Sequence, residues 1–359
     1  MTATTSASPG LVTSDKVILG SAVVLGVLAG LADRGHWNSV VAFFVSAAAV
    51  CVLASVVGRS VEQLGDRFGA GATGVLQSAL GNLPELFICI FSLRAGLDDV
   101  VRAALVGSIL ANLLLVLGLA FLVGGLRHGT QQLGSDRART IVVLMLLSVS
   151  AWALPSFTQW LHTPASAHET TFSVIVSVLL LLLFAASLPF SLRRDSSDDA
   201  GEHDQPRWPI GLAVGLLAVA GIAAAFVSEW FVNALQPAMD ALSINETFAG
   251  LVIVAIAGNA VENVVGVQLA ARDQSAYAFS VILNSPIQIA LVLAPALVLI
   301  SQIFGIGSLT LVLSPLLVVV LMLAIVLAAF IAFDGESTWL EGGSLIVLYV
   351  IIATSFWWG

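Results

Sequence analysis

Charged residues are scarce in this chain of 359 residues. Asp, Glu, Lys and Arg make up 10% of it, whereas an ordinary soluble domain contains about 25%. One lysine, Lys16, accompanies twelve arginines, and the formal net charge is −9. Because a nucleic-acid binder needs a basic patch to neutralise phosphates, this composition argues against nucleic-acid binding and leaves cations as the charged partners.

Cysteine is also scarce, and the chain begins without a basic segment. Cys51 and Cys89 both fall inside apolar runs, which argues against a disulfide framework or a thiolate metal site and indicates core residues. Residues 1–16 are mostly small and polar. We expect them to form a disordered N-terminal tail rather than a signal peptide, which would carry a basic region before its apolar stretch.

Long apolar runs are abundant. Apolar side chains make up 58% of the chain, and the mean hydropathy is +1.03. A helix needs about 20 apolar residues to cross a bilayer, far more than a barrel strand needs. The sequence therefore predicts an all-α membrane protein with about 11 transmembrane helices. The predicted helices cover residues 17–31, 38–57, 74–93, 103–123, 140–158, 171–192, 210–228, 247–270, 276–302, 309–332 and 342–358.

An acidic linker over residues 193–208 divides the chain into halves of similar size. It is either a solvated connector or a cation-sensing regulatory segment. Basic residues predict a cytoplasmic N-terminus, because ten of them then face the cytoplasm and three face the opposite side. The ten are Lys16, Arg59, Arg67, Arg127, Arg137, Arg139, Arg193, Arg194, Arg207 and Arg272, and the three are Arg34, Arg94 and Arg102.

The ionisable residues predicted at membrane depth are all acids. Glu85 and Glu262 fall near helix centres, and Glu62 and Glu229 fall nearer helix ends. A centred acid costs roughly 2.5–3.5 kcal/mol unless something compensates for its charge. Since no basic side chain is predicted beside Glu85 and Glu262, each is either protonated or bound to a cation from outside.

The two central acids belong to a duplicated motif, G-N-x-x-E, at residues 81–85 and 258–262. At helical spacing its Gly, Asn and Glu share one helix face, where amide and carboxylate oxygens suit a hard cation. Pro84 either frees the carbonyl of Leu80 as a ligand or serves packing alone. The predicted cation- and proton-binding residues of the motif are Gly81, Asn82, Glu85, Gly258, Asn259 and Glu262, and Glu85 and Glu262 are the predicted metal ligands.

A second repeat follows each copy of the motif. Ser108 and Asn112 are echoed by Ser280 and Asn284 at the same spacing, and Gln288 extends the second copy by one turn. We add these five residues to the predicted binding set. The two motif helices, third and eighth in order, cross in opposite directions, as inverted repeats require, and such transporters bind their substrate near the midplane.

These motifs resemble those of the calcium/proton exchangers of the calcium/cation antiporter superfamily. The resemblance covers about residues 55 to 300. Besides the two G-N-x-x-E motifs, it includes EQLGDRFG from Glu62, GSILANLLLVLG at 107–118, SEWFV at 228–232, INETFAGL at 244–251 and SPIQIAL at 285–291.

The resemblance implies one leading helix, residues 17–32, and two inverted five-helix repeats, residues 38–192 and 209–359. It also implies that Glu85 and Glu262 bind cation and protons alternately, supported by Asn82 and Asn259. Glu62 and Glu229 match acidic residues that such exchangers place near the access routes of the ions.

This sequence departs from the family pattern at three places. Leu83-Pro84 stands where a small pair is common, Asn263 where a histidine is common, and Pro286 where serine is common. The L-P-E variant resembles the sodium/calcium exchanger branch of the superfamily. The absence of the histidine leaves the glutamates to carry the protons.

The predicted function is antiport of Ca²⁺, or a related divalent cation, for protons, without a cofactor or enzymatic activity. A sodium- or potassium-for-proton antiporter on the same fold, a cation channel and an intramembrane enzyme are the alternatives. Inorganic cations, protons and the lipid bilayer are the expected partners, and the sequence leaves open a homo-oligomer. The near-absence of lysine beside abundant Ala, Val and Arg favours a bacterial plasma membrane.

Overall fold

The computed structural model describes residues 10–68, 76, 80–133, 136–198 and 207–358. Helices account for most of this part of the chain, and the prediction of an all-α membrane protein is confirmed. Residues 1–9 of the predicted tail and 199–206 of the predicted linker lie outside the described residues.

Nine helices in the described part of the chain are long and apolar enough to cross a bilayer. Two further apolar stretches are shorter or interrupted, and they are the ones that carry the G-N-x-x-E motifs. The count of eleven crossings therefore stays a prediction. The nine spans are Thr13–Arg34, Ser39–Gly65, Asp98–His128, Arg139–Trp160, Pro164–Leu188, Ile210–Leu242, Ser275–Phe304, Pro315–Asp334 and Trp339–Trp357.

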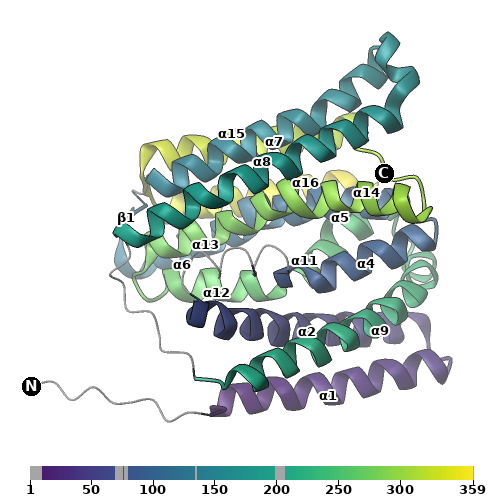
Figure 1. Ribbon diagram of the computed structural model, residues 1–359, viewed down its shortest axis with the longest axis horizontal. Helices are drawn as coiled ribbons and strands as arrows, with labels where there is room; N and C mark the ends of the chain where they lie inside the picture. The colour runs from purple at the N-terminus through teal and green to yellow at the C-terminus, as the bar shows by residue number, and fades with distance from the viewer. Residues whose placement is uncertain (1–9, 69–75, 77–79, 134–135, 199–206, 359) are drawn as a thin grey trace, which may run out of the picture. The chain divides into compact units, whose positions relative to one another are not determined.

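The chain divides into two compact units, and the first contains residues 1–88 and 185–238. Its principal helices are α1 (Thr13–Arg34), α2 (Ser39–Phe68), the start of α4 (Leu83–Arg94) and most of α9 (Ile210–Leu242). In Figure 1, α1 and α2 lie side by side. Aromatic rings join α9 to them, since Phe43 stacks on Phe231 with ring centroids 5.0 Å apart.

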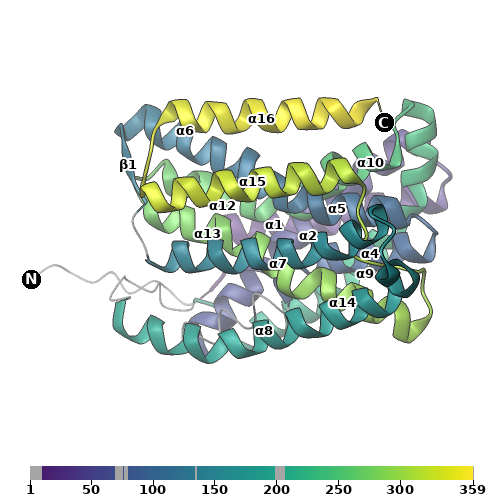
Figure 2. The ribbon, with the colours of Figure 1, turned by 90° about the horizontal axis from the view of Figure 1, so that it is seen from above.

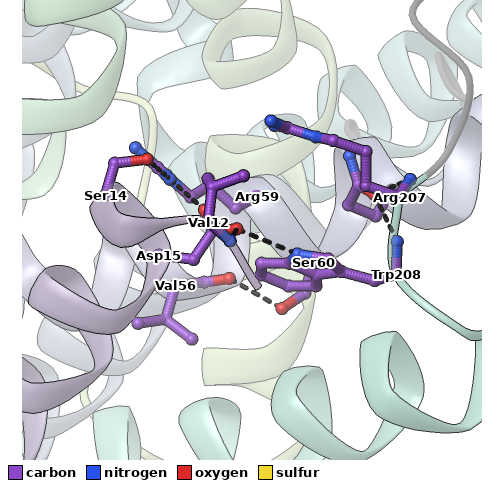
Figure 3. A network of polar contacts seen from close by, with 9 residues as sticks. Val12, Ser14, Asp15, Val56, Arg59, Ser60, Arg207 and Trp208 are labelled. Carbon is purple, nitrogen blue, oxygen red and sulfur yellow. Dashed lines mark hydrogen bonds and ion pairs between the residues drawn. The ribbon is translucent and has the colours of Figure 1, made fainter. Parts of the chain in front are cut away.

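A buried polar cluster ties three segments of the first unit together (Figure 3). Asp15 at the start of α1 is paired with Arg59 of α2 and accepts a hydrogen bond from the indole of Trp208 at 3.1 Å. The Oε1 atom of Gln63 accepts from the backbone N–H groups of Arg207 and Trp208, at 2.7 and 3.0 Å. These contacts fix the entry to α9 against α2.

The second unit contains residues 89–184 and 239–359. Gly118 of α6 and Gly342 of α16 let those helices approach backbone to backbone, because a Cβ at Gly342 would lie 2.6 Å from the Gly118 carbonyl oxygen. Figure 2 shows α6 and α16 together. The elements of the second unit are the end of α4, α5 (Asp98–Leu110), η2 (Ala111–Val116), α6 (Leu117–His128), β1 (Gln131–Gln132), α7 (Asp136–Trp160), η3 (Pro164–His168), the first part of α8 (Glu169–Asp198), the end of α9, α10 (Glu246–Phe248), η4 (Ala249–Val254), α11 (Ala255–Gly258), α12 (Ala260–Ala270), α13 (Ser275–Gln288), η5 (Ile289–Leu293), α14 (Ala294–Phe304), α15 (Pro315–Asp334), β2 (Glu336–Ser337) and α16 (Trp339–Trp357).

Loops of the second unit are fastened by short polar contacts. Strands β1 and β2 pair antiparallel, with Gln131 opposite Ser337. In the buried segment between α14 and α15, the hydroxyl of Ser173 accepts from the N–H of Leu311 at 3.1 Å, and that of Ser156 accepts from Leu313 at 2.9 Å. Extended backbone inside an apolar unit thus obtains hydrogen bonds that a helix would make internally.

Several predicted boundaries differ from the structure. Helix α2 continues to Phe68 and α9 to Leu242, although their predicted ends are residues 57 and 228. Helix α1 begins at Thr13, so the last residues of the predicted tail, 13–16, are helical. Helix α8 continues to Asp198, although the predicted linker starts at residue 193. In each case a segment that contains polar residues extends the helix beyond its apolar stretch, where hydropathy alone gives no signal.

Candidate cation site

The helix carrying the first motif is interrupted at the motif itself. Gly81 lies in a π-helical turn, Asn82 lies in a turn, and α4 begins at Leu83. The carbonyl of Asn82 accepts from the N–H of Leu86 at 2.9 Å. Glu85 therefore lies in the first turn of a helix, where the N–H groups favour negative charge, and it is 1% exposed.

This geometry changes the interpretation of Pro84. Proline at the second residue of a helix removes an N–H that has no helical partner there, so Pro84 starts α4 rather than kinking a longer helix. The predicted role of the Leu80 carbonyl as a ligand stays a prediction.

The second motif has the same interruption. Helix α11 ends at Gly258, and α12 begins at Ala260; Asn259 between them has φ −106° and ψ 20°. Glu262 is the third residue of α12. The predicted continuous helices 74–93 and 247–270 are therefore each interrupted at the motif asparagine, and the shared face of Gly, Asn and Glu stays a prediction.

Four buried side chains form a hydrogen-bonded network in the second unit. The Nδ2 atom of Asn112 donates to Oδ1 of Asn259 at 3.2 Å and to Oγ of Ser285 at 3.4 Å. The hydroxyl of Ser285 also donates to Oδ1 of Asn259 at 3.2 Å, and Nδ2 of Asn259 donates to the hydroxyl of Ser108 at 2.8 Å. Residues from three helices, distant in sequence, are thus brought together.

The two asparagines of this network differ in what they leave available. Both ends of the Asn259 amide are engaged, because its Nδ2 also donates to the carbonyl of Ala255 at 2.9 Å. The Nδ2 atom of Asn112 donates hydrogen bonds, one of them to the Ser108 carbonyl at 2.9 Å. Its buried Oδ1 has no hydrogen-bond partner among the described residues. An amide oxygen in this condition is a hard donor suited to a cation.

Glycines allow the helices that carry the network to pack closely. A Cβ at Gly107 would lie 2.1 Å from the carbonyl oxygen of Leu251 in η4, and one at Gly250 would lie 2.4 Å from that of Val100 in α5. Because α5 and η4 meet backbone to backbone, Ser108 and Asn259 come within hydrogen-bonding distance.

The remaining predicted residues lie outside this network. Ser280 and Asn284 lie half-buried on α13, whereas Gln288, at the end of the same helix, is 4% exposed. Glu262 lies in α12, and its side chain falls outside the described part of the chain. In the first unit, Glu62 is exposed on α2 and Glu229 is half-buried on α9.

The sequence interpretation missed Ser285. The chosen spacing paired Ser280 with Asn284, whereas Ser285 and Gln288 of the same helix are the deeply buried pair. No spacing along the chain marks out Ser285, because its role depends on how α13 packs against Asn112 and Asn259. Besides the turn at Gly81, three further π-helical stretches were missed: η2 contains Asn112, η4 precedes Asn259 and η5 follows Gln288. Such turns are frequent at functional sites.

Comparison with known proteins gives extensive similarity. The family model described as sodium/calcium exchanger protein matches residues 38–193 and again 212–358. The Ca²⁺/H⁺ antiporter ChaA of Bacillus subtilis is 33% identical over 95% of this chain and 97% of its own length. The Ca²⁺/H⁺ antiporter of Aphanothece halophytica is 33% identical over 89% of this chain and 91% of its own.

Solved structures agree with these matches. Native YfkE superposes with a TM-score of 0.82 at 31% identity, covering 95% of this chain and all of that one. The H⁺/Ca²⁺ exchanger CAX superposes with a TM-score of 0.75 at 17% identity, covering 96% and 92% of the two chains, which shows the shared fold. The chain is an integral membrane protein that belongs to the sodium/calcium exchanger protein family.

Proposed function

We propose that this protein exchanges Ca²⁺, or a related divalent cation, for protons, with Glu85 and Glu262 shared by cation and protons. The observation that carries the proposal is the duplicated motif, in which each glutamate lies in the first turn of a helix restarting at the motif asparagine. The names of the relatives, Ca²⁺/H⁺ antiporters at about one-third identity, support the choice of substrates.

Charge balance supplies the coupling. Two ionised carboxylates neutralise one divalent cation, and when the cation leaves, protons neutralise the same carboxylates before the return step. Because a carboxylate cannot hold a proton and a cation together, each release permits the other binding event. Helix N-termini at both glutamates favour the ionised carboxylates over the protonated ones.

Amides and hydroxyls complete the binding set. The Oδ1 atom of Asn112 is the neutral oxygen best placed to bind the cation in the second unit, because no described residue donates to it. Asn259 instead holds the helix interruption in place through its four hydrogen bonds. Asn82, Asn284 and Gln288 are the further amides of the set, and Ser108 and Ser280 are its hydroxyls.

Orientation and access belong to the same proposal. The distribution of basic residues supports a cytoplasmic N-terminus in a bacterial plasma membrane. Glu62 and Glu229 attract cations near the access routes, and their incomplete burial supports that role. Gly81 and Gly258 would let another backbone approach closely beside the two interruptions.

A sodium- or potassium-for-proton antiporter is the second candidate. The L-P-E sequence at residues 83–85, which resembles the sodium/calcium exchanger branch, is the observation that favours it. Tracer uptake of calcium and of sodium into proteoliposomes under an imposed pH gradient separates the two candidates.

The same assay tests the glutamates. We expect Glu85→Gln and Glu262→Gln to abolish calcium uptake driven by the pH gradient, since an amide carries neither the charge nor the transported proton. Glu336→Gln is the matched control, because Glu336 is exposed in β2 and accepts a bond that glutamine also accepts. Proton-coupled calcium uptake at the wild-type rate in either Glu85→Gln or Glu262→Gln would contradict the mechanism.

A further inference from the structure

A buried tryptophan of the second unit donates a hydrogen bond to the backbone of a π-helical turn. Trp152 of α7 is 1% exposed, and its Nε1–H donates to the carbonyl oxygen of Ala290 in η5 at 3.2 Å. Ala290 is fully buried. The bond joins residues 138 positions apart in the sequence, so it fixes one helix against another.

The carbonyl of Ala290 needs this donor because of a proline. At the end of η5 the N–H of Ala294 bonds to the carbonyl of Ile289, five residues earlier, which is the bond of a π-helical turn. The next bond of this pattern would run from residue 295 to Ala290, but residue 295 is a proline and has no N–H. The indole supplies the missing donor, and a buried carbonyl is thereby satisfied.

The turn follows Gln288 directly. A π-helical turn contains an extra residue, which rotates the helix before it by about 100° relative to the helix after it. Since η5 separates α13 from α14, reversion of the turn to α-helix would change the direction of the Gln288 side chain. The bond from Trp152 therefore affects the direction of the Gln288 side chain, which is a predicted ligand.

We propose that Trp152 is a positioning residue for cation binding: its indole N–H replaces the bond that Pro295 cannot make, holds η5 as a π-helical turn, and so directs Gln288. This inference rests on the proposed function for its effect on transport. Its structural part, the dependence of η5 on the indole N–H, stands independently of the transported ion.

A rescue experiment separates this role from packing. Trp152→Phe removes the N–H and part of the ring, whereas Pro295→Ala supplies a backbone N–H at residue 295. If the missing donor is the cause, adding Pro295→Ala to Trp152→Phe restores function; if lost ring volume is the cause, it does not. Trp160→Phe is the matched control, because Trp160 lies at the end of the same helix and packs against Phe157.

Two measurements are made on the purified full-length chain. Calcium uptake into proteoliposomes gives KM and kcat, and hydrogen exchange of residues 289–296 in cation-free protein reports the turn. We expect Trp152→Phe to raise KM about 5- to 30-fold, the range that corresponds to one unsatisfied buried carbonyl, with a smaller change in kcat. We also expect it to speed hydrogen exchange in η5. The double variant should return both towards wild type, and Trp160→Phe should change neither.

The outcomes are decisive in each case. Unchanged hydrogen exchange in Trp152→Phe, or no rescue by Pro295→Ala, overturns the proposal. Faster exchange with an unchanged KM also overturns it, because the turn would then not direct a ligand. Wild-type protein without calcium uptake would instead defeat the proposed function, and hydrogen exchange with rescue would still decide the role of the indole in η5. Should Trp152→Phe not fold, recovery of folded protein in the double variant supports the proposal and continued misfolding overturns it.

Discussion

At the scale of single residues, the buried asparagines hold opposite roles within one network. Both amide atoms of Asn259 form hydrogen bonds to the protein, whereas the buried Oδ1 of Asn112 has no donor among the described residues. A buried polar atom left without a partner is destabilising by about 1–3 kcal/mol, so its retention suits an atom that is satisfied by a ligand.

Replacing Asn112 tests that assignment. We expect Asn112→Ala to raise the KM for the transported cation at least 10-fold, because it removes the oxygen and releases Asn259 from one of its bonds. Ser344→Ala is the control, since Ser344 is exposed on α16, bonds to the Leu340 carbonyl of its own helix, and should leave KM within about twofold of wild type. Equal effects of the two substitutions on tracer uptake would contradict a ligand role for Asn112.

A second prediction at this scale concerns Asp15. Asp15→Asn keeps an oxygen for the Trp208 indole but removes the charge that pairs with Arg59, whose side chain is 32% exposed. We expect the free energy of unfolding to fall by about 1–2 kcal/mol and the apparent melting temperature in detergent to fall with it. Asp33→Asn, at a partly exposed site bonded to Asn233, should leave the melting temperature unchanged. Indistinguishable melting of the two variants would show that the cluster contributes no stability.

At the scale of helices, hydropathy predicted nearly all the spans but not where the motif helices break. A window average treats the run 247–270 as one helix, although Asn259 interrupts it. The interruption depends on side-chain bonds to Ser108 and Asn112, which lie about 150 residues away in the sequence and come close only after folding. The π-helical turns were not predicted either, because they too depend on contacts between distant residues. In η5, for example, the carbonyl of Ala290 accepts a hydrogen bond from Trp152.

Close packing of α5 on η4 gives a prediction for the elements themselves. Gly107→Ala should lower the apparent melting temperature and abolish cation uptake, because its Cβ would meet the Leu251 backbone, which cannot move aside like a side chain. Gly215→Ala is the control: Gly215 lies in α9, and a Cβ at this position would have no neighbouring atom within 4 Å, so alanine should be neutral or stabilising by about 0.5–1 kcal/mol. Normal melting and uptake in Gly107→Ala would contradict the packing argument.

At the scale of the whole molecule, the scarcity of charge predicted the membrane fold, and the duplicated motif predicted the family. Both depend on patterns along the chain. The length of the apolar runs indicates helices that cross a bilayer, and the repetition of G-N-x-x-E indicates two related halves. Ser285 was not predictable in this way. Its role depends on the register of α13 against Asn112 and Asn259, which no local spacing encodes.

Topology is the prediction that belongs to the whole chain. If eleven helices cross the membrane and basic residues hold the N-terminus inside, the C-terminus lies outside, with Trp357 and Trp358 near the interface. Alkaline phosphatase fused to the C-terminus should then be active, since its disulfides form only in an oxidising compartment, and a fused fluorescent protein should be dark. The same reporters placed in the linker 193–208 should give the reverse. A fluorescent C-terminal fusion would contradict this topology. Together with a fluorescent linker fusion it would mean an even number of crossings, and together with an active phosphatase in the linker it would mean that the N-terminus lies outside.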